Sequence, residues 1–216
     1  DLQENNWNIK TDIKASGLVD KFVSFTFKAE SKGLLDDGKL KPEIYNFYYE
    51  IKNKNKSREA SIKYNDGIPI SLKANPPYRG NDILSKDDLF KYGSNSSDPN
   101  SAFVVSGVYE NPCLESSRSF DGVRSYEIKM SERTKKGKLI INENKYEIIL
   151  CKGSFNPIVG YEESDFLETA SEKNSIAYWY KYFDKEKMWV PLKFTIDTPI
   201  GALVVKANKI TNNKKK

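Results

Sequence analysis

Residues 21–28, with the sequence KFVSFTFK, show the pattern on which the fold prediction rests. Val23, Phe25 and Phe27 fall on one side of an extended chain, and the residues that alternate with them fall on the other. A period of two is typical of a β-strand with one buried face. We therefore expect a strand over 22–31.

Similar segments, which alternate or are rich in aromatic residues, recur along the chain. About ten strands joined by turns predict a mainly β protein, with a strongly curved antiparallel sheet or an open β-barrel, because closure removes exposed edges. The predicted strands are 7–14, 22–31, 44–52, 57–64, 68–73, 119–131, 138–142, 145–155, 176–182, 189–197 and 202–211.

Turn residues separate most of these segments. Asp36–Gly38 and Asn65–Gly67 each contain an Asp-Gly pair between extended runs, which is a strong hairpin signal. Glycine, proline and asparagine supply further turns. These further turns are predicted at Gly137, 142–144, 184–187 and 199–201.

An insert over about 82–109 has a different character. Residues 85–92 predict a short helix that ends at Gly93. Asp98 followed by Pro99 predicts a second helix, because Asp caps free amides and Pro fits the first turn. We expect this helix, the main one of the chain, to run from Pro99 to about Val108. We also expect the whole chain, 1–216, to form one domain.

Composition excludes several classes of protein. The chain of 216 residues contains no histidine, which excludes histidine-dependent serine and cysteine mechanisms and metal sites with imidazole ligands. No segment approaches the roughly 18 apolar residues of a membrane-spanning helix. No glycine-rich nucleotide motif or serine nucleophile elbow occurs, so we expect no cofactor and no metal.

The positive charge of the chain does not predict a nucleic-acid partner. There are 35 basic and 30 acidic residues, a net charge of +5, but only five of the basic residues are arginines. Nucleic-acid surfaces usually depend on arginine. The basic runs at 52–58, 135–138 and 214–216 are interpreted as turns and a terminal tail.

The segment from Phe120 to Arg124, FDGVR, is a candidate ligand motif because Asp121 and Arg124 flank Gly122. The alternative is a β-turn or bulge with a local ion pair. Asp98 is expected to cap a helix rather than to act as a catalytic acid. The acidic residues of 162–168 are expected to be a solvated loop, because neither glycosidase nor calcium-site spacing is present.

Aromatic residues are the remaining signal. Thirteen Tyr, eleven Phe and three Trp make up 12% of the chain. Ordinary β propensity explains most of them. A functional interpretation is an apolar cavity or cleft, with Tyr178 and Tyr180 among its lining candidates.

Two cysteines, Cys113 and Cys151, each lie beside a segment of β character. Their spacing fits no metal motif, so a disulfide in an oxidising compartment is one prediction. Two buried free thiols remain the alternative.

Several short motifs, read in order, resemble a family of exported proteobacterial envelope proteins described as domain of unknown function 3108. The resemblance covers most of the chain. It includes Tyr126, which follows the FDGVR segment. The matching positions are 15–19, Pro76-Pro77, Asp98-Pro99, Cys113, Phe120-Asp121-Gly122, Arg124, Tyr126, Cys151, Pro157-Ile158, Gly160, Val190-Pro191, Thr198-Pro199 and Gly201.

This resemblance implies a precursor with a signal peptide, a periplasmic location, a curved antiparallel sheet and a Cys113–Cys151 disulfide. Family members usually have one more strand before the segment that begins at Trp7. We therefore expect an exposed sheet edge beside 7–14. The family has no established activity, so it implies no catalytic residue.

These observations lead to three functional hypotheses. The first is a noncatalytic protein that binds an apolar or lipid-like envelope component. The second is a structural protein that recruits an envelope partner through its sheet surface or edge. The third is a hydrolase that uses Asp98, Asp121 and Arg124, which requires all three to converge.

Overall fold

The computed structural model describes residues 2–3, 5–15, 24–36, 38–78, 85–114 and 116–210. The chain divides into two compact units, and both long strands β9 and β10 have residues in each. The single domain expected from the sequence remains a prediction. The first unit comprises Asp1–Phe103, Ser117–Glu127 and Pro157–Tyr161, and the second comprises Val104–Ser116, Ile128–Asn156 and Glu162–Lys216.

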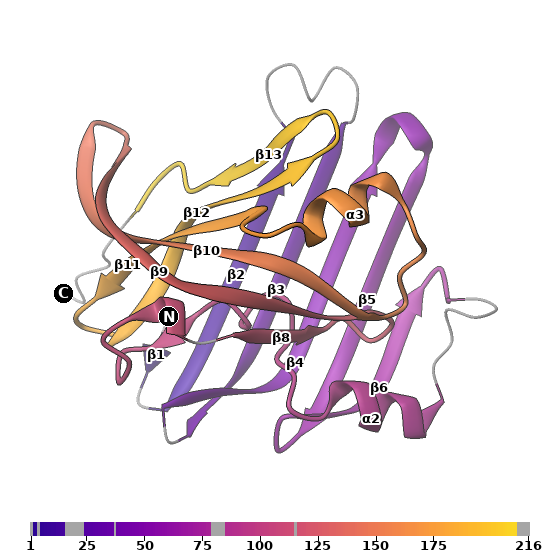
Figure 1. Ribbon diagram of the computed structural model, residues 1–216. Coiled ribbons are helices and arrows are strands. Elements are labelled where there is room, and N and C mark those ends of the chain that lie inside the picture. Colours follow the sequence, from indigo (N-terminus) through magenta and orange to yellow (C-terminus); the bar gives the residue numbers. More distant parts are fainter. Residues whose placement is uncertain are drawn as a thin grey trace. The chain divides into compact units, whose positions relative to one another are not determined.

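A six-stranded antiparallel sheet forms most of the first unit, with its strands in sequence order (Figure 1). Its hairpins include the predicted turn at Asn65–Gly67, where Asp66 and Gly67 both have positive φ. Its strands are β1 (Leu2–Gln3), β2 (Asn6–Lys14), β3 (Phe25–Asp36), β4 (Lys39–Ile51), β5 (Lys56–Asn65) and β6 (Ile68–Asn75).

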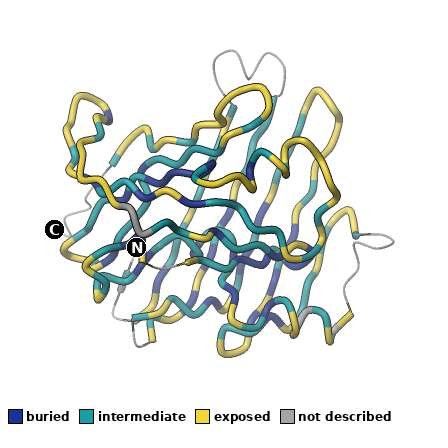
Figure 2. The backbone as a smooth tube through the Cα atoms, in the orientation of Figure 1, coloured by how far each residue is buried: buried dark blue, intermediate teal, exposed yellow. Residues whose placement is uncertain are grey.

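Strand alternation builds the core of this sheet. In β4, Tyr45 and Phe47 are buried, whereas Tyr48 between Phe47 and Tyr49 is exposed. Ala60 and Ile62 continue the buried row on β5. Figure 2 shows buried residues along the strands and exposed residues at the turns. The period of two in the sequence thus places one face of each strand in the core.

The edge beside β2 is partly covered. β1 pairs with β2 only at Asn6 and Trp7. Among the described residues, the rest of this edge has no paired strand, as expected from the sequence. Phe22 and Val23 of the predicted strand, and residues 16–19 of the family resemblance, lie outside the described residues.

The short helix predicted to end at Gly93 is confirmed as α2 (Lys86–Gly93). The Ser85 hydroxyl accepts a hydrogen bond from the Asp88 N–H at 3.1 Å, and the Asp88 carboxylate accepts one from the Ser85 N–H at 3.3 Å. This reciprocal pair is a capping box, which satisfies two amides at the helix start.

The helix predicted from Pro99 to about Val108 is wrong. Asp98 caps a single turn, in which the amides of Ser101 and Ala102 donate to its carbonyl oxygen. The chain then extends into β7 (Val105–Ser106). A cap supplies only the first hydrogen bonds, whereas a helix needs propagation, which β-branched residues such as Val104 and Val105 do not favour.

A second antiparallel sheet contains seven strands in the order β13-β12-β11-β10-β9-β8, with β7 paired to β12. The predicted turn at Gly137 is wrong, because β9 continues through this residue. A Cβ atom at this position would lie 3.3 Å from the Ile148 side chain. The other strands are β8 (Ser117–Phe120), β9 (Ser125–Ile141), β10 (Asn144–Val159), β11 (Ile176–Phe183), β12 (Met188–Thr198) and β13 (Gly201–Lys206).

The predicted mainly β class is confirmed, and one of the two sheets is strongly curled into a half-barrel. The chain also has a helix where we expected an acidic loop, α3 (Asp165–Ser171). The Ser164 hydroxyl caps it by accepting a hydrogen bond from the Leu167 N–H at 3.3 Å. Asp165 and Glu168 lie in its first turn, where negative charge is favourable.

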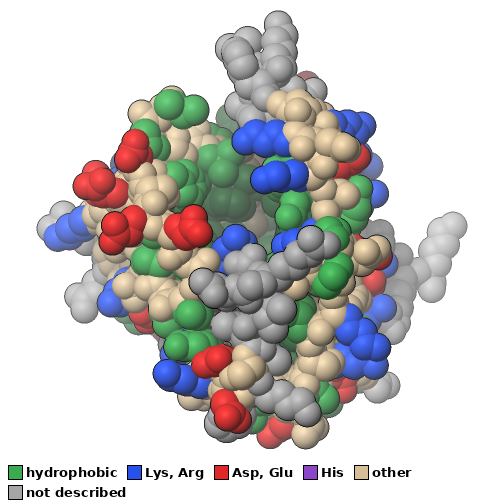
Figure 3. All heavy atoms as spheres, turned by 90° about the vertical axis from the view of Figure 1, so that its right-hand side faces the viewer, with side chains coloured by type: hydrophobic (Ala, Val, Ile, Leu, Met, Phe, Trp, Pro, Cys, Tyr) green, Lys and Arg blue, Asp and Glu red, His purple; other side chains and the backbone are tan. Residues whose placement is uncertain are grey.

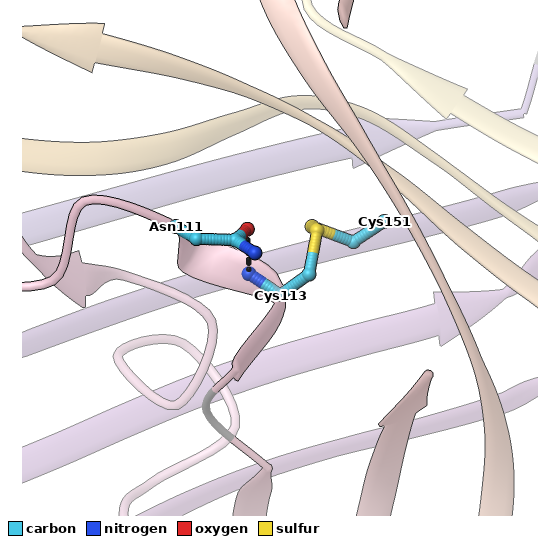
Figure 4. Close-up of a disulfide and its surroundings, with 3 residues drawn as sticks. All are labelled: Asn111, Cys113 and Cys151. Atoms are coloured by element: carbon cyan, nitrogen blue, oxygen red, sulfur yellow. Dashed lines mark hydrogen bonds between the residues drawn. A yellow bond between two sulfur atoms is a disulfide. The ribbon is translucent and has the colours of Figure 1, made fainter. Parts of the chain in front are cut away.

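The predicted disulfide is present between Cys113 and Cys151, both in the second unit (Figure 4). Cys113 lies in the short 3₁₀ turn Pro112–Leu114, and Cys151 lies in β10. The Asn111 side-chain oxygen accepts a hydrogen bond from the Cys113 N–H at 3.1 Å. Both cysteines are buried. The bond therefore fixes an irregular segment to a strand.

None of the helices in the described part of the chain has both the length and the apolar character that crossing a membrane requires.

Candidate functional site

The FDGVR segment folds as a tight turn. One Asp121 carboxylate oxygen accepts hydrogen bonds from the N–H groups of Val123, at 2.9 Å, and Arg124, at 2.6 Å. The Asp121 N–H donates to the Arg124 carbonyl at 3.0 Å. The carboxylate thus organises its own loop, as Asp side chains commonly do in turns.

Gly122 and Phe120 attach this turn to the core of the first unit. Gly122 has a φ of +94°, which favours glycine. A Cβ atom at this position would lie 3.0 Å from side-chain atoms of both Ile62 and Leu72. The Phe120 side chain is fully buried. The motif is therefore a packed structural element.

Arg124 extends from the turn and is half exposed. Its Nε donates to the Gly160 carbonyl at 3.2 Å, and its guanidinium lies 5.9 Å from the Tyr161 ring centroid. Its nearest contact with the Asp121 carboxylate is 4.0 Å. Residues 120–124 therefore form a turn with a local ion pair, which is the alternative interpretation given above for this segment.

Asp98 is fully buried, and its carboxylate has four hydrogen bonds. The hydroxyl of Ser31 on β3 donates at 2.5 Å, as does that of Ser101. The N–H groups of Asn100 and Ser101 donate at 2.9 and 3.1 Å. Burial raises the pKa of Asp98, although these hydrogen bonds oppose the shift. With its oxygens engaged, Asp98 holds the 98–101 turn to the sheet.

Three tyrosines, Tyr45, Tyr64 and Tyr126, interact electrostatically with these two acids. Burial, together with the negative charges of Asp98 and Asp121, raises the pKa of Tyr45 and Tyr64 well above its ordinary value. Burial also raises the pKa of Tyr126 to about 12, against a hydrogen bond with Ser119. Asp98, Asp121 and Tyr126 are thus brought together in the first unit.

Tyr178 and Tyr180 belong to a different environment, in the second unit. Both are buried side chains on one face of β11, with ring centroids 5.8 Å apart. Tyr178 also lies 5.9 Å from the ring of Phe194 on the neighbouring strand. These tyrosines are core residues of their sheet.

The second unit contains a groove of about 900 Å³, with aromatic residues in its lining as the sequence led us to expect of an apolar cleft, although the candidates Tyr178 and Tyr180 do not line it. Its apolar lining comes from Ile148 and Ile149 of β10, Tyr182 of β11 and Trp189 of β12. The remaining lining residues are Glu110, Lys136, Gly137, Lys138, Lys145, Glu147, Lys181 and Asp184.

Two contacts fix the aromatic part of this groove. The rings of Tyr182 and Trp189 lie 5.0 Å apart at an angle of 51°. The Trp189 indole N–H donates to the Tyr109 carbonyl at 2.9 Å, which orients the ring. Ile149 pairs with Tyr180 and therefore shares the face of Tyr182 and Trp189, so these three side chains form an apolar floor.

Lysines form much of the rim. Lys136 and Lys138 of β9 and Lys145 of β10 are exposed, and none forms an ion pair with a described residue. Lys181 donates to the Tyr182 carbonyl at 3.0 Å. Four lysines against three carboxylates leave the groove with a net charge of +1. Two features of the sequence pointed to this site, the aromatic residues around Tyr182 and the lysine run at 135–138, which was interpreted as a turn.

Charge elsewhere on the surface is mixed. Figure 3 shows basic and acidic side chains together on the face that it presents. Among the residues in the described ranges, no group of three Asp, Glu or Cys side chains is arranged to hold a metal ion.

No family model, curated protein or solved structure matches the chain.

Proposed function

We propose that the protein is a noncatalytic binding protein of the bacterial periplasm that binds an anionic amphiphile, such as a fatty acid or a lysophospholipid. The observation that carries the proposal is the groove of the second unit, in which an apolar floor adjoins Lys136, Lys138 and Lys145, three exposed lysines that form no ion pair with a described residue, on a rim of net charge +1. The ligand would place its hydrocarbon chain along Ile149, Tyr182 and Trp189. Its anionic head would contact the lysines of the β9–β10 hairpin.

Ligand sites usually combine an apolar lining with a few convergent polar groups, within a volume of roughly 300–1,000 Å³. The groove, at about 900 Å³, fits that description. Lysine offers a flexible point charge, which suits a carboxylate or phosphate head of variable position. Burial of methylene groups contributes about 0.8 kcal/mol each, so the chain supplies most of the affinity.

The periplasmic location is proposed from the resemblance to exported envelope proteins. The Cys113–Cys151 disulfide supports it, because disulfides persist in oxidising compartments.

Calorimetric titration with sodium dodecanoate and with uncharged monolauroylglycerol tests the proposal. We expect dodecanoate to bind about ten-fold more tightly, and Lys136→Glu/Lys138→Glu to remove that preference. Lys135→Glu is the matched control, because this exposed lysine is adjacent in sequence but does not line the groove. No saturable binding of either compound to the folded protein would contradict the proposal.

A second function is favoured by the edge strand β13, which ends its sheet. Among the described residues, no strand pairs with its outer edge, and Leu203 and Val204 are 44% and 53% exposed. An envelope partner would add a strand there through backbone hydrogen bonds. A photo-crosslinking residue at Val204 should then capture one specific protein in the periplasm, and Leu203→Pro, with the crosslinking residue kept at position 204, should reduce the yield of the adduct.

A further inference from the structure

The first unit has a groove of its own, of about 710 Å³, on the six-stranded sheet. Three consecutive residues from each of five adjacent strands line it, so it runs across the strands. The lining residues are Lys10–Asp12 of β2, Lys28–Glu30 of β3, Asn46–Tyr48 of β4, Glu59–Ser61 of β5 and Lys73–Asn75 of β6.

The groove lies on the face of the sheet opposite the core. The middle residues on β3, β4 and β5, which are Ala29, Phe47 and Ala60, have buried side chains. Their flanking residues point to the other face, because successive side chains alternate along a strand. The walls therefore consist of polar side chains and Tyr48, and the floor is the backbone of the middle row.

The charges of these walls balance. Three lysines and three carboxylates line the groove. Glu30 lies 3.4 Å from Lys10 and 3.1 Å from Lys32, and hydrogen bonding to Lys32 contributes most to lowering its pKa. A polyanion or polycation would meet like charges here, whereas a neutral ligand meets none.

The polar groups include both donors and acceptors. Lysine ammonium groups and the amides of Asn46 and Asn75 donate, and carboxylate and amide oxygens accept. Sugar hydroxyl groups both donate and accept, so this mixture suits them. Tyr48, which is 37% exposed, offers a ring face for the apolar face of a pyranose.

We propose that this groove binds a neutral oligosaccharide chain laid across the sheet. Neighbouring strands lie about 4.8 Å apart, so five strands span about 19 Å, which is about the length of a tetrasaccharide. The proposal is independent of the amphiphile site, because it concerns different residues in a different unit.

An extended peptide fits this site less well. Peptides that bind sheets do so by adding a strand at an edge, where backbone groups are free. The strands under the groove are already paired with their neighbours at these positions, for example Ala29 with Phe47 and Phe47 with Ala60. Only side chains are therefore available for recognition.

Binding of neutral tetrasaccharides tests the proposal, with cellotetraose, chitotetraose, mannotetraose and maltotetraose as probes. We expect at least one to bind the full chain, at least ten-fold more tightly than its monosaccharide. Ser61→Trp should weaken that binding at least ten-fold by filling the part of the groove over β5. Ser71→Trp is the matched control, because Ser71 occupies the same face on β6, opposite Lys63, and does not line the groove.

Tyr48→Ala is a second test, and it should also weaken binding about ten-fold in a protein that is still folded at the temperature of the titration. Failure of all four tetrasaccharides to bind at 10 mM would overturn the proposal. So would equal effects of Ser61→Trp and Ser71→Trp, or binding of an uncharged hexapeptide in place of the sugars.

Discussion

Replacement of Gly122 by alanine tests whether the FDGVR segment is a packed turn. At a φ of +94°, an alanine is in a backbone region that L-residues avoid, at a cost of about 1–2 kcal/mol. Its Cβ would also approach Ile62 and Leu72 to 3.0 Å. Overpacking of this kind typically costs about 1–3 kcal/mol. We therefore expect the free energy of unfolding to fall by about 2–5 kcal/mol.

Gly67→Ala separates the two contributions. Gly67 has a comparable φ of +76°, but the nearest neighbour of its added Cβ among the described residues would be the Lys41 Cγ at 4.0 Å. Only the backbone cost of about 1–2 kcal/mol should then appear. Urea denaturation, followed by both circular dichroism and tryptophan fluorescence, measures each loss and checks two-state behaviour. Equal losses for the two variants would refute the packing argument for Gly122.

Three further predictions concern stability. The double variant Cys113→Ala/Cys151→Ala should lose about 4 kcal/mol of unfolding free energy, because the disulfide closes a loop with a sequence separation of 38; a loss below about 1 kcal/mol in urea denaturation would contradict this. Ser164→Ala should cost about 1 kcal/mol by removing the α3 cap, and an unchanged unfolding midpoint would argue against that cap. Because burial raises the pKa of Asp98, the folded protein holds the carboxyl proton of Asp98 more tightly than the unfolded chain does. The free energy of unfolding, relative to that of Asp98→Asn, should therefore fall as the pH rises above 3.8. If the difference in unfolding free energy between the two proteins did not change with pH, the raised pKa would be contradicted.

Local pattern was sufficient for most of the strands. The alternation around Phe25 and Phe27, and the turn at Asn65–Gly67, depend on neighbouring residues alone, so they are readable in the sequence. The helix predicted at Pro99 failed because tertiary contacts decide that segment. Asp98 bonds to Ser31, which is 67 residues earlier in the chain.

Other features were visible but were given the wrong weight. Ser164 followed by acidic residues is a helix-start signal, although the segment was interpreted as a solvated loop. Gly137 was interpreted as a turn, yet a strand tolerates glycine where a neighbour such as Ile148 approaches closely. An apolar cleft was expected from the aromatic residues, but the residues that line each groove were not predictable, because they depend on which strands lie side by side.

The most direct test of the proposed function is the indole N–H spectrum of the protein during titration with dodecanoate. The chain has three tryptophans, Trp7, Trp179 and Trp189, and only Trp189 lines the groove of the second unit. After assignment with Trp189→Phe, we predict a saturable shift of the Trp189 signal, with the other two unchanged. Saturable binding that leaves the Trp189 signal in place, or no saturable shift of any signal, would contradict the proposal.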